Sequence, residues 1–197
     1  MRKKHLKQYR YIGSPEIKDS VANYPIGTRI TSQEDLKTWL DNNKESSEYI
    51  VCTFIIDLEG YLRIANRHSE HVACSGGESV MSAGEIFFSL DRNQYQVVEI
   101  SNQSTGFCPE PESWIWVSQA LERIPLIHPG NFTNSFIFRR CIKCNLLNIV
   151  KNDSYICADC NAGLPLVWNC ELTLLEIAEP AFERVWNNSE DAEYDKL

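Results

Sequence analysis

The stretch Tyr49-Ile-Val-Cys-Thr-Phe-Ile-Ile-Asp57 is rich in β-branched and aromatic residues and is almost continuously apolar. Such a run is typical of a central strand that is buried on both faces of a sheet. The turn Leu58-Glu-Gly60 and the alternating stretch Tyr61-Leu-Arg-Ile-Ala65 follow it directly. We therefore predict a hairpin whose first strand lies in the middle of the fold.

Further strands and helices are predicted on both sides of this hairpin. Residues 80–90 and 94–100 favour two antiparallel strands joined at Asp91-Arg-Asn93, with Gly84 marking a bulge or a close backbone approach. Thr31-Ser-Gln-Glu34 resembles a capping box, which predicts a helix from about Ser32 to Leu40. A second helix is expected within residues 110–123, with Pro111 and Glu112 in its first turn, and a short one opens at Ser14-Pro15-Glu16. Residues 66–77 show no periodicity and are expected to form a loop.

These elements predict an α+β protein with a small antiparallel sheet and flanking helices, followed by a zinc ribbon. We expect four segments: a basic start (1–10), the α+β domain (11–130), the ribbon (131–165) and an amphipathic tail with an acidic end (166–197). The 43% hydrophobic residues are enough to supply a packed core.

Two Cys-x-x-Cys pairs lie close together in the last third of the chain, Cys141/Cys144 and Cys157/Cys160. Each such turn presents two thiolates, and zinc takes four ligands at the corners of a tetrahedron. The residues between the pairs predict a hairpin that turns at Lys151-Asn-Asp-Ser154. The spacing therefore predicts a structural zinc site. A redox pair and two disulfides are the alternatives, but nothing marks the chain as secreted.

The charge is unevenly distributed along the chain. The formal net charge of −8 argues against a surface built for nucleic acid as a whole, because such binding neutralises phosphates. The ribbon is nevertheless basic and aromatic, with Phe136, Phe138 and Tyr155. This mixture makes nucleic-acid binding an alternative function, with four candidate binding residues: Arg139, Arg140, Lys143 and Lys151.

The loop after the first hairpin contains side chains that could carry chemistry. His68, His71 and Cys74, together with Cys108, have the ligand types for a second metal site. The same region could instead form a catalytic or ligand pocket with His68, Glu70, His71 and Glu85 as acid and base candidates and Asn102 nearby. The third interpretation is that the histidines lie in a loop, the cysteines are buried, and they share no common role.

A family resemblance is carried by residues 68–109. The layout His68-Ser69, Gly76-Gly77-x-x-Val80-x-x-Ala83-Gly84-Glu85-Ile86 and Ser101-Asn102-x-Ser104-x-Gly106-x-x-Pro109 resembles the small β domain with a Ser-Gly-His-Tyr-x-Pro signature. That domain occurs in bacterial toxin-like proteins and in plant calmodulin-binding IQ-motif proteins. Here the signature lacks its His and Tyr. The resemblance implies that the His68 loop and the Ser101 to Pro109 loop lie together beside a small sheet, and it implies no reaction.

We expect a zinc-binding adaptor or recognition protein that engages a protein partner through its ribbon and pocket loops. A nucleic-acid-binding zinc-ribbon protein and an enzyme with a His/Glu site around His68 and His71 are the alternative functions. No nucleotide, nucleophile-elbow or metalloprotease motif is present. No apolar run approaches the roughly 20 residues needed to span a bilayer, so we expect no membrane association and a cytoplasmic location.

Overall fold

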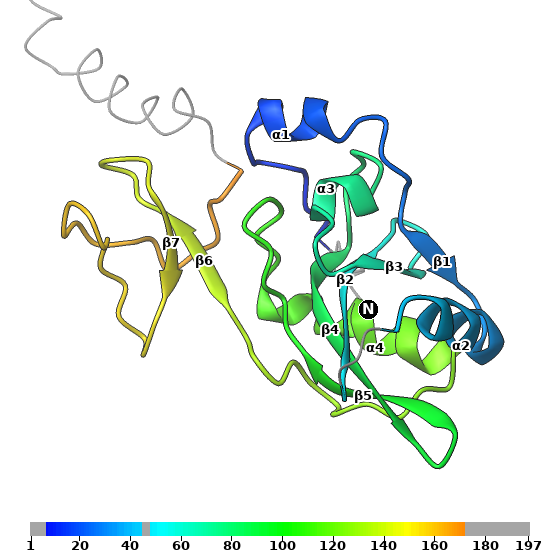
Figure 1. Ribbon diagram of the computed structural model, residues 1–197. Helices are drawn as coiled ribbons and strands as arrows, with labels where there is room; N and C mark the ends of the chain where they lie inside the picture. The colour runs from blue at the N-terminus through cyan, green and yellow to red at the C-terminus, as the bar shows by residue number, and fades with distance from the viewer. Residues whose placement is uncertain (1–6, 45–47, 172–197) are drawn as a thin grey trace, which may run out of the picture. The chain divides into compact units, whose positions relative to one another are not determined.

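The computed structural model describes residues 7–44 and 48–171, and the chain divides into two compact units between Phe138 and Arg139 (Figure 1). The units are described separately. The predicted basic start and amphipathic tail lie largely outside the described residues, which begin at Lys7 and end at Glu171. No helix in the described part has the length and apolar character required to cross a bilayer.

The first unit is built on a five-stranded antiparallel sheet, which confirms the predicted α+β class (Figure 1). The strand order is β1-β3-β2-β4-β5. The strands are β1 (Thr28–Ile30), β2 (Ile50–Ile56), β3 (Leu62–Asn66), β4 (Ser82–Asp91) and β5 (Gln94–Ile100). The stretch predicted to be the central strand is therefore β2, with its hairpin partner β3 on one side and β4 on the other.

Both faces of β2 are covered, which explains its nearly continuous apolar sequence. Phe54 and the alternate residues of the strand belong to the main apolar core, together with side chains of α2 (Gln33–Asn42) and α4 (Trp114–Arg123). On the opposite face, the Thr53 hydroxyl donates to the backbone oxygens of Arg67 and Ser69. Trp39, Trp114 and Trp116 pack against the core, as expected for structural residues.

The hairpin of β4 and β5 follows the prediction, with one refinement. Its turn places Arg92 and Asn93 at positive φ (46° and 67°), the conformation favoured in two-residue hairpin loops. The register shift lies between Phe87 and Phe88 rather than at Gly84. Gly84 instead marks a close approach, because a Cβ there would lie 1.9 Å from the Ser101 carbonyl oxygen.

The helix starts differ from their predictions in detail. Ser32, and not Thr31, caps α2 by accepting from the Asp35 N–H, and the Asp35 carboxylate accepts from the N–H and hydroxyl of Thr31. The capping pattern is thus shifted by one residue. Asp35, rather than Glu34, supplies the carboxylate that accepts from Thr31. A 3-10 turn, η1 (Pro111–Ser113), precedes α4, while α1 (Pro15–Ser20) begins as predicted. The predicted loop 66–77 contains a short helix, α3 (His71–Cys74).

The two edges of the sheet are short or covered. Strand β1 has three residues. Beside β5, the N–H of Val97 donates to the Ile127 oxygen and the N–H of Thr133 donates to the Ile100 oxygen. Ser101 also forms a parallel bridge with Asn134. Residues 127–134 thus run along the outer side of β5.

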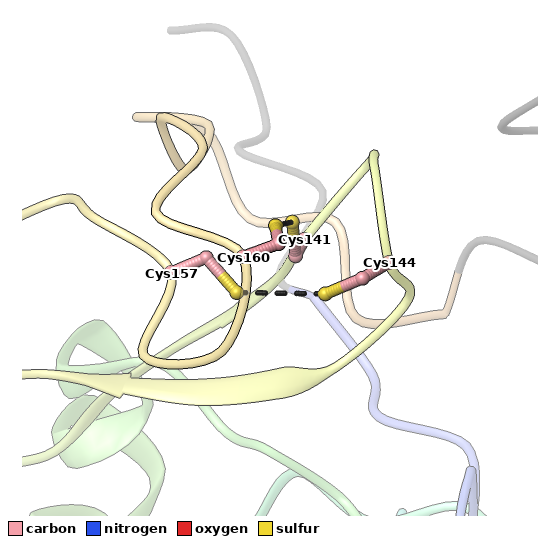
Figure 2. Close-up of side chains that lie close together, drawn as sticks. All are labelled: Cys141, Cys144, Cys157 and Cys160. Carbon is pink, nitrogen blue, oxygen red and sulfur yellow. Dashed lines mark hydrogen bonds between the residues drawn. The ribbon is translucent and has the colours of Figure 1, made fainter.

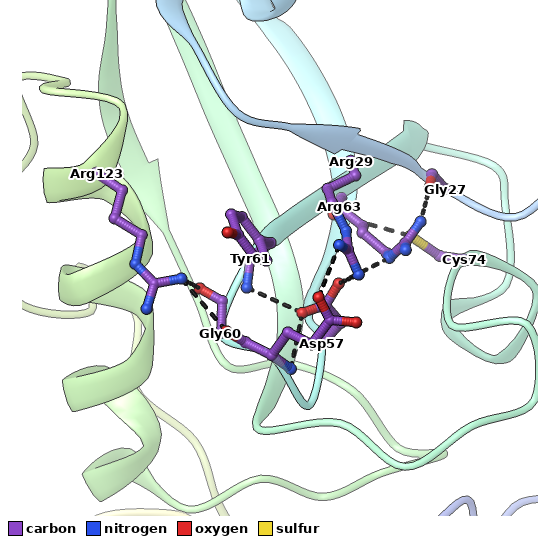
Figure 3. A network of polar contacts seen from close by, with 9 residues as sticks. Gly27, Arg29, Asp57, Gly60, Tyr61, Arg63, Cys74 and Arg123 are labelled. Carbon is purple, nitrogen blue, oxygen red and sulfur yellow. Dashed lines mark hydrogen bonds and ion pairs between the residues drawn. The ribbon is translucent and has the colours of Figure 1, made fainter.

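A charged network fixes the end of the β2–β3 hairpin (Figure 3). The Asp57 carboxylate accepts from the backbone of Tyr61 and pairs with Arg63 and Arg29 at 3.0 and 2.8 Å. The Tyr61 ring lies near the guanidinium groups of Arg29 and Arg123, with centroid distances of 4.7 and 5.0 Å. Since Arg29 and Arg63 both pair with Asp57, we interpret this network as structural.

The strand pairing around the cysteines differs from the predicted hairpin. Strands β6 (Ile137–Arg140), which spans the division of the chain, and β7 (Leu147–Val150) form a two-stranded sheet. The predicted turn follows β7, with Asn152 and Asp153 at positive φ and a bridge between Lys151 and Ser154. Ile156 returns to bridge Gly163. The division of the chain falls later than the predicted domain boundary at residue 131. Phe132 belongs to the core of the first unit, and Phe136 is hydrogen-bonded to the Asn102 side chain at 2.7 Å, which accounts for the difference.

Candidate metal centre

The four predicted ligand cysteines come together in one cluster (Figure 2). The sulfur atoms of Cys141, Cys144, Cys157 and Cys160 all lie within 4.8 Å of one another. The closest pairs, Cys141 with Cys160 and Cys144 with Cys157, are separated by 3.5 Å. A disulfide bond would need about 2.05 Å. A tetrahedral ion with four bonds of about 2.3 Å needs edges of about 3.8 Å, so the cluster has the size of a metal site.

Both cysteine pairs adopt the same backbone turn. The N–H of the first cysteine of each pair donates to the carbonyl five residues later, that of Leu146 or Ala162. An asparagine follows each pair, and its N–H donates back to the first cysteine of that pair. Asn145 and Asn161 have φ of 63° and 58°, a left-handed conformation that asparagine tolerates better than most residues. The repeated sequence Cys-x-x-Cys-Asn therefore builds two matching thiolate-presenting turns.

A buried asparagine and backbone N–H groups support Cys157. Asn148 donates from its amide to the Cys157 sulfur at 3.7 Å and accepts from the Ala158 N–H at 2.9 Å. Backbone N–H groups of Cys160 and Asp159 lower the pKa of the Cys157 thiol because they stabilise the negative sulfur. The Cys144 sulfur lies 3.5 Å from that of Cys157, and the pKa of Cys144 is raised. The Leu146 N–H lowers this pKa, but burial and hydrogen bonds with the neighbouring sulfurs raise it. The two pKa shifts run in opposite directions, so Cys157 loses its proton more readily than Cys144.

The surrounding arginines hold the unit together. Arg140 donates from its guanidinium to the backbone oxygens of Asn145 and Cys170, both at 3.1 Å. Arg139 is buried and donates to the Leu166 oxygen at 3.0 Å. Of the four basic residues predicted as binding residues, only Lys143 and Lys151 are exposed.

The alternative ligands His68, His71, Cys74 and Cys108 do not form a second cluster. In residues 7–44 and 48–171, the four-cysteine group is the only set of three or more such ligands within metal-binding distance. Cys74 donates weakly to the Arg63 oxygen and Cys108 to the Thr105 oxygen, and both are buried. His68 is exposed.

Two of the acid and base candidates do share a pocket. Glu70 and His71 line a pocket of about 210 Å³ together with Thr105 and Gly106 of the following loop. Residues 70–72 and residues 105–106 therefore lie around the same pocket. His68 and Glu85 are not among the residues that line it, and the Asn102 side chain is occupied in bridging Pro109 and Phe136.

Several residues of these sites were not identified from the sequence. The asparagines after each cysteine pair could have been found, because Cys-x-x-Cys-Asn occurs twice. Asn148 has no such signal. Tyr11 also lines the pocket, but no functional role was assigned to it from the sequence. No local sequence pattern indicates that Tyr11 lies close to residues 70 and 105.

No protein-family model matches the chain, and neither a curated protein nor a solved structure matches it at a significant level.

Proposed function

We propose that this chain is a zinc-binding recognition protein, in which a zinc-stabilised ribbon and the pocket loops of the α+β unit engage a protein partner. The observation that carries the proposal is the group of four cysteine sulfurs within 4.8 Å of one another. Four thiolates in a tetrahedral arrangement suit zinc, and the same donor set also suits iron. A structural zinc site is closed by four protein ligands, whereas a catalytic one keeps a position open. The centre therefore supports a structural role.

The surface of the ribbon favours a protein partner over nucleic acid. Ile142, Leu146 and Ile156 expose 58%, 42% and 58% of their surface around the cysteine turns. Contiguous exposed apolar patches mark protein interaction sites, and these three side chains lie in or next to the two cysteine turns in the sequence. Lys143 and Lys151 are the exposed cations, and a zinc ion with four thiolates adds negative charge beside them. Nucleic-acid binding remains the second candidate on the strength of those two lysines.

A reducing compartment suits this proposal. Thiolate ligands must stay reduced, and no disulfide forms among the described residues, which hold all eight cysteines. A cytoplasmic location is part of the proposal for that reason.

Elemental analysis of the purified full chain tests the zinc centre. We expect one zinc per chain, and we expect Cys157→Ser to lose it. Cys170→Ser is the matched control, because Cys170 is a buried cysteine of the same unit outside the cluster. Iron in place of zinc, no metal, or two zinc ions per chain would contradict the proposal.

An oligonucleotide titration separates the two partner classes. We expect no binding of single- or double-stranded DNA or RNA at low salt. Binding that weakens with salt and is reduced in Lys143→Gln and Lys151→Gln would favour the nucleic-acid alternative instead.

A further inference from the structure

A pocket beside the sheet of the first unit is formed by three segments that are distant in sequence. Its lining comes from residues 11–17, from the start of α3 and from the loop that follows β5, and its volume is about 210 Å³. The backbone N–H of Ile12 donates to the Gly106 oxygen at 2.7 Å and holds two of the segments together. Pockets for drug-sized ligands measure about 300 to 1,000 Å³, so this one suits a group of side-chain size.

Two glycines seat an aromatic ring in this pocket. A Cβ at Gly13 would lie 2.4 Å from the Tyr11 hydroxyl oxygen, and a Cβ at Gly106 would lie 2.6 Å from a ring carbon of Tyr11. The ring also packs edge-on against Phe107, with centroids 5.6 Å apart. Only residues without side chains leave room for the ring here, so its position is closely defined.

Two side-chain donors at the pocket are already used by the protein. The Tyr11 hydroxyl donates to the Ser14 carbonyl at 3.3 Å, so its oxygen is left as an acceptor. The Ser14 hydroxyl donates to the Glu16 carboxylate and accepts from the Ile17 N–H.

His71 likewise has its donor committed. Its Nε2 lies 3.0 Å from the Gly84 oxygen, and a carbonyl can only accept, so Nε2 carries the hydrogen. Burial lowers the pKa of His71, which favours the neutral ring and leaves a lone pair on Nδ1.

The charge at the pocket is negative. Glu70 is exposed, and its carboxylate has no hydrogen-bond or ion-pair partner among residues 7–44 and 48–171. Its charge is felt at Tyr11, whose pKa is raised by burial and by Glu70. No lysine or arginine lines the pocket. An anionic ligand would therefore be repelled by the carboxylate and would lack hydrogen-bond donors. A cationic ligand with N–H groups could donate hydrogen bonds to these acceptors and place its charge on the face of the Tyr11 ring.

We propose that the pocket of Tyr11, Glu70, His71 and Thr105 binds an ammonium or guanidinium group, carried by a free alkylamine or guanidine or by a basic side chain of a peptide. This inference deepens the pocket half of the proposed function and does not depend on the zinc centre. Glu70 supplies the countercharge, Nδ1 of His71 and the Tyr11 oxygen accept hydrogen bonds, and the Tyr11 ring faces the cation.

An NMR titration of the full chain with n-butylguanidinium, followed at the His71 and Tyr11 ring signals, tests the proposal. The neutral isostere n-butylurea is the ligand control. We expect the guanidinium to bind at least tenfold more tightly than the urea, and Glu70→Gln to remove that preference. Glu78→Gln is the matched variant, because it removes an exposed carboxylate outside the pocket.

The source of the cation is distinguished with a capped Gly-Arg-Gly peptide. Binding of the peptide as tight as that of butylguanidinium identifies a peptide side chain, and exclusion of the peptide identifies a small free cation. Equal binding of butylguanidinium and butylurea, equal effects of the two Glu→Gln variants, or preferential binding of acetate would overturn the proposal. Zinc content measured on the same samples shows separately whether the metal centre is intact, so the failure of one proposal is distinguishable from that of the other.

Discussion

The two units of this chain are stabilised in different ways. The first has an extensive apolar core, in which fully buried side chains such as Phe54, Phe88 and Leu40 come from several strands and helices. The core of the second consists of Cys141, Cys157 and Leu164, with a few partly buried neighbours. Two of the three residues in this cluster are thus candidate metal ligands. A unit of this size cannot rely on apolar burial and needs a metal or another cross-link, whereas the first can fold on its own packing.

The largest expected effect on this contrast comes from removing the proposed zinc ion. We expect chelation, or Cys157→Ser, to unfold residues 139–171 while residues 7–138 stay folded, because structural zinc contributes on the order of 10 kcal/mol to folding in small zinc peptides. Hydrogen exchange followed by mass spectrometry measures the two units separately. Cys170→Ser is the control. Protection of residues 139–171 that survives metal removal would show that the ribbon folds without its ion.

The converse test is a substitution that creates a cavity in the apolar core of the first unit. Phe54 is fully buried in β2, and Phe54→Ala should lower the free energy of unfolding of that unit by about 3–5 kcal/mol. Urea unfolding followed by tryptophan fluorescence measures the loss, and zinc content should not change. Leu58→Ala, at a position with 48% exposure in the adjacent turn, should change stability by less than about 0.5 kcal/mol. Similar losses for both variants would contradict the assignment of β2 as the core strand.

Substitutions at two glycines, one in each unit, compare how tightly the backbone is packed in the two units. Gly84→Ala brings a Cβ to 1.9 Å from the Ser101 oxygen and should cost about 1–3 kcal/mol. Gly163→Ala in the ribbon meets no atom within 4 Å, so we expect less than about 0.5 kcal/mol. Thermal unfolding of each variant against the wild type gives both values. If Gly84→Ala were neutral, the loop after β5 would not approach the strand as closely as the structure shows.

The smallest expected effect is a pH dependence confined to the first unit. Burial lowers the pKa of His71 below its ordinary value of 6.5, so the unfolded chain takes up a proton at a higher pH than the folded one. The contribution of His71 to stability is therefore full above about pH 6.5 and is lost as pH falls through the lower, folded-state pKa. His71→Gln should flatten the decline in unfolding free energy between about pH 7 and 5, and His68→Gln should not. An unchanged slope in His71→Gln would show that another group is responsible.

The sequence predicted those features that depend on local pattern or fixed spacing. The apolar run of residues 49–57 identified the central strand, because a run rich in β-branched and aromatic residues is typical of a strand covered on both faces. The cysteine spacing identified the cluster for a similar reason, since two close pairs can meet around one ion. The hairpin turn at Asp91-Arg-Asn93 was predicted from a polar stretch between two strand-like runs, and the structure places Arg92 and Asn93 there at positive φ.

Features that depend on tertiary contacts were not accessible in this way. The four-residue α3 is too short to show helical periodicity. The arginines of the ribbon look like ligand-binding residues in sequence, and only the fold shows that backbone oxygens take up their donors. The pocket depends on Tyr11 meeting residues distant from it in the chain, which no local pattern encodes.

The short β1 and the segment that runs along β5 have a consequence for behaviour at high concentration. Unpaired N–H and C=O groups on the rim of a sheet can recruit strands from other molecules and start aggregation. Here one rim offers only three residues, and the other is occupied by residues 127–134. We therefore expect the folded sheet to resist growth by strand addition, even though its central strand is among the most apolar segments of the chain.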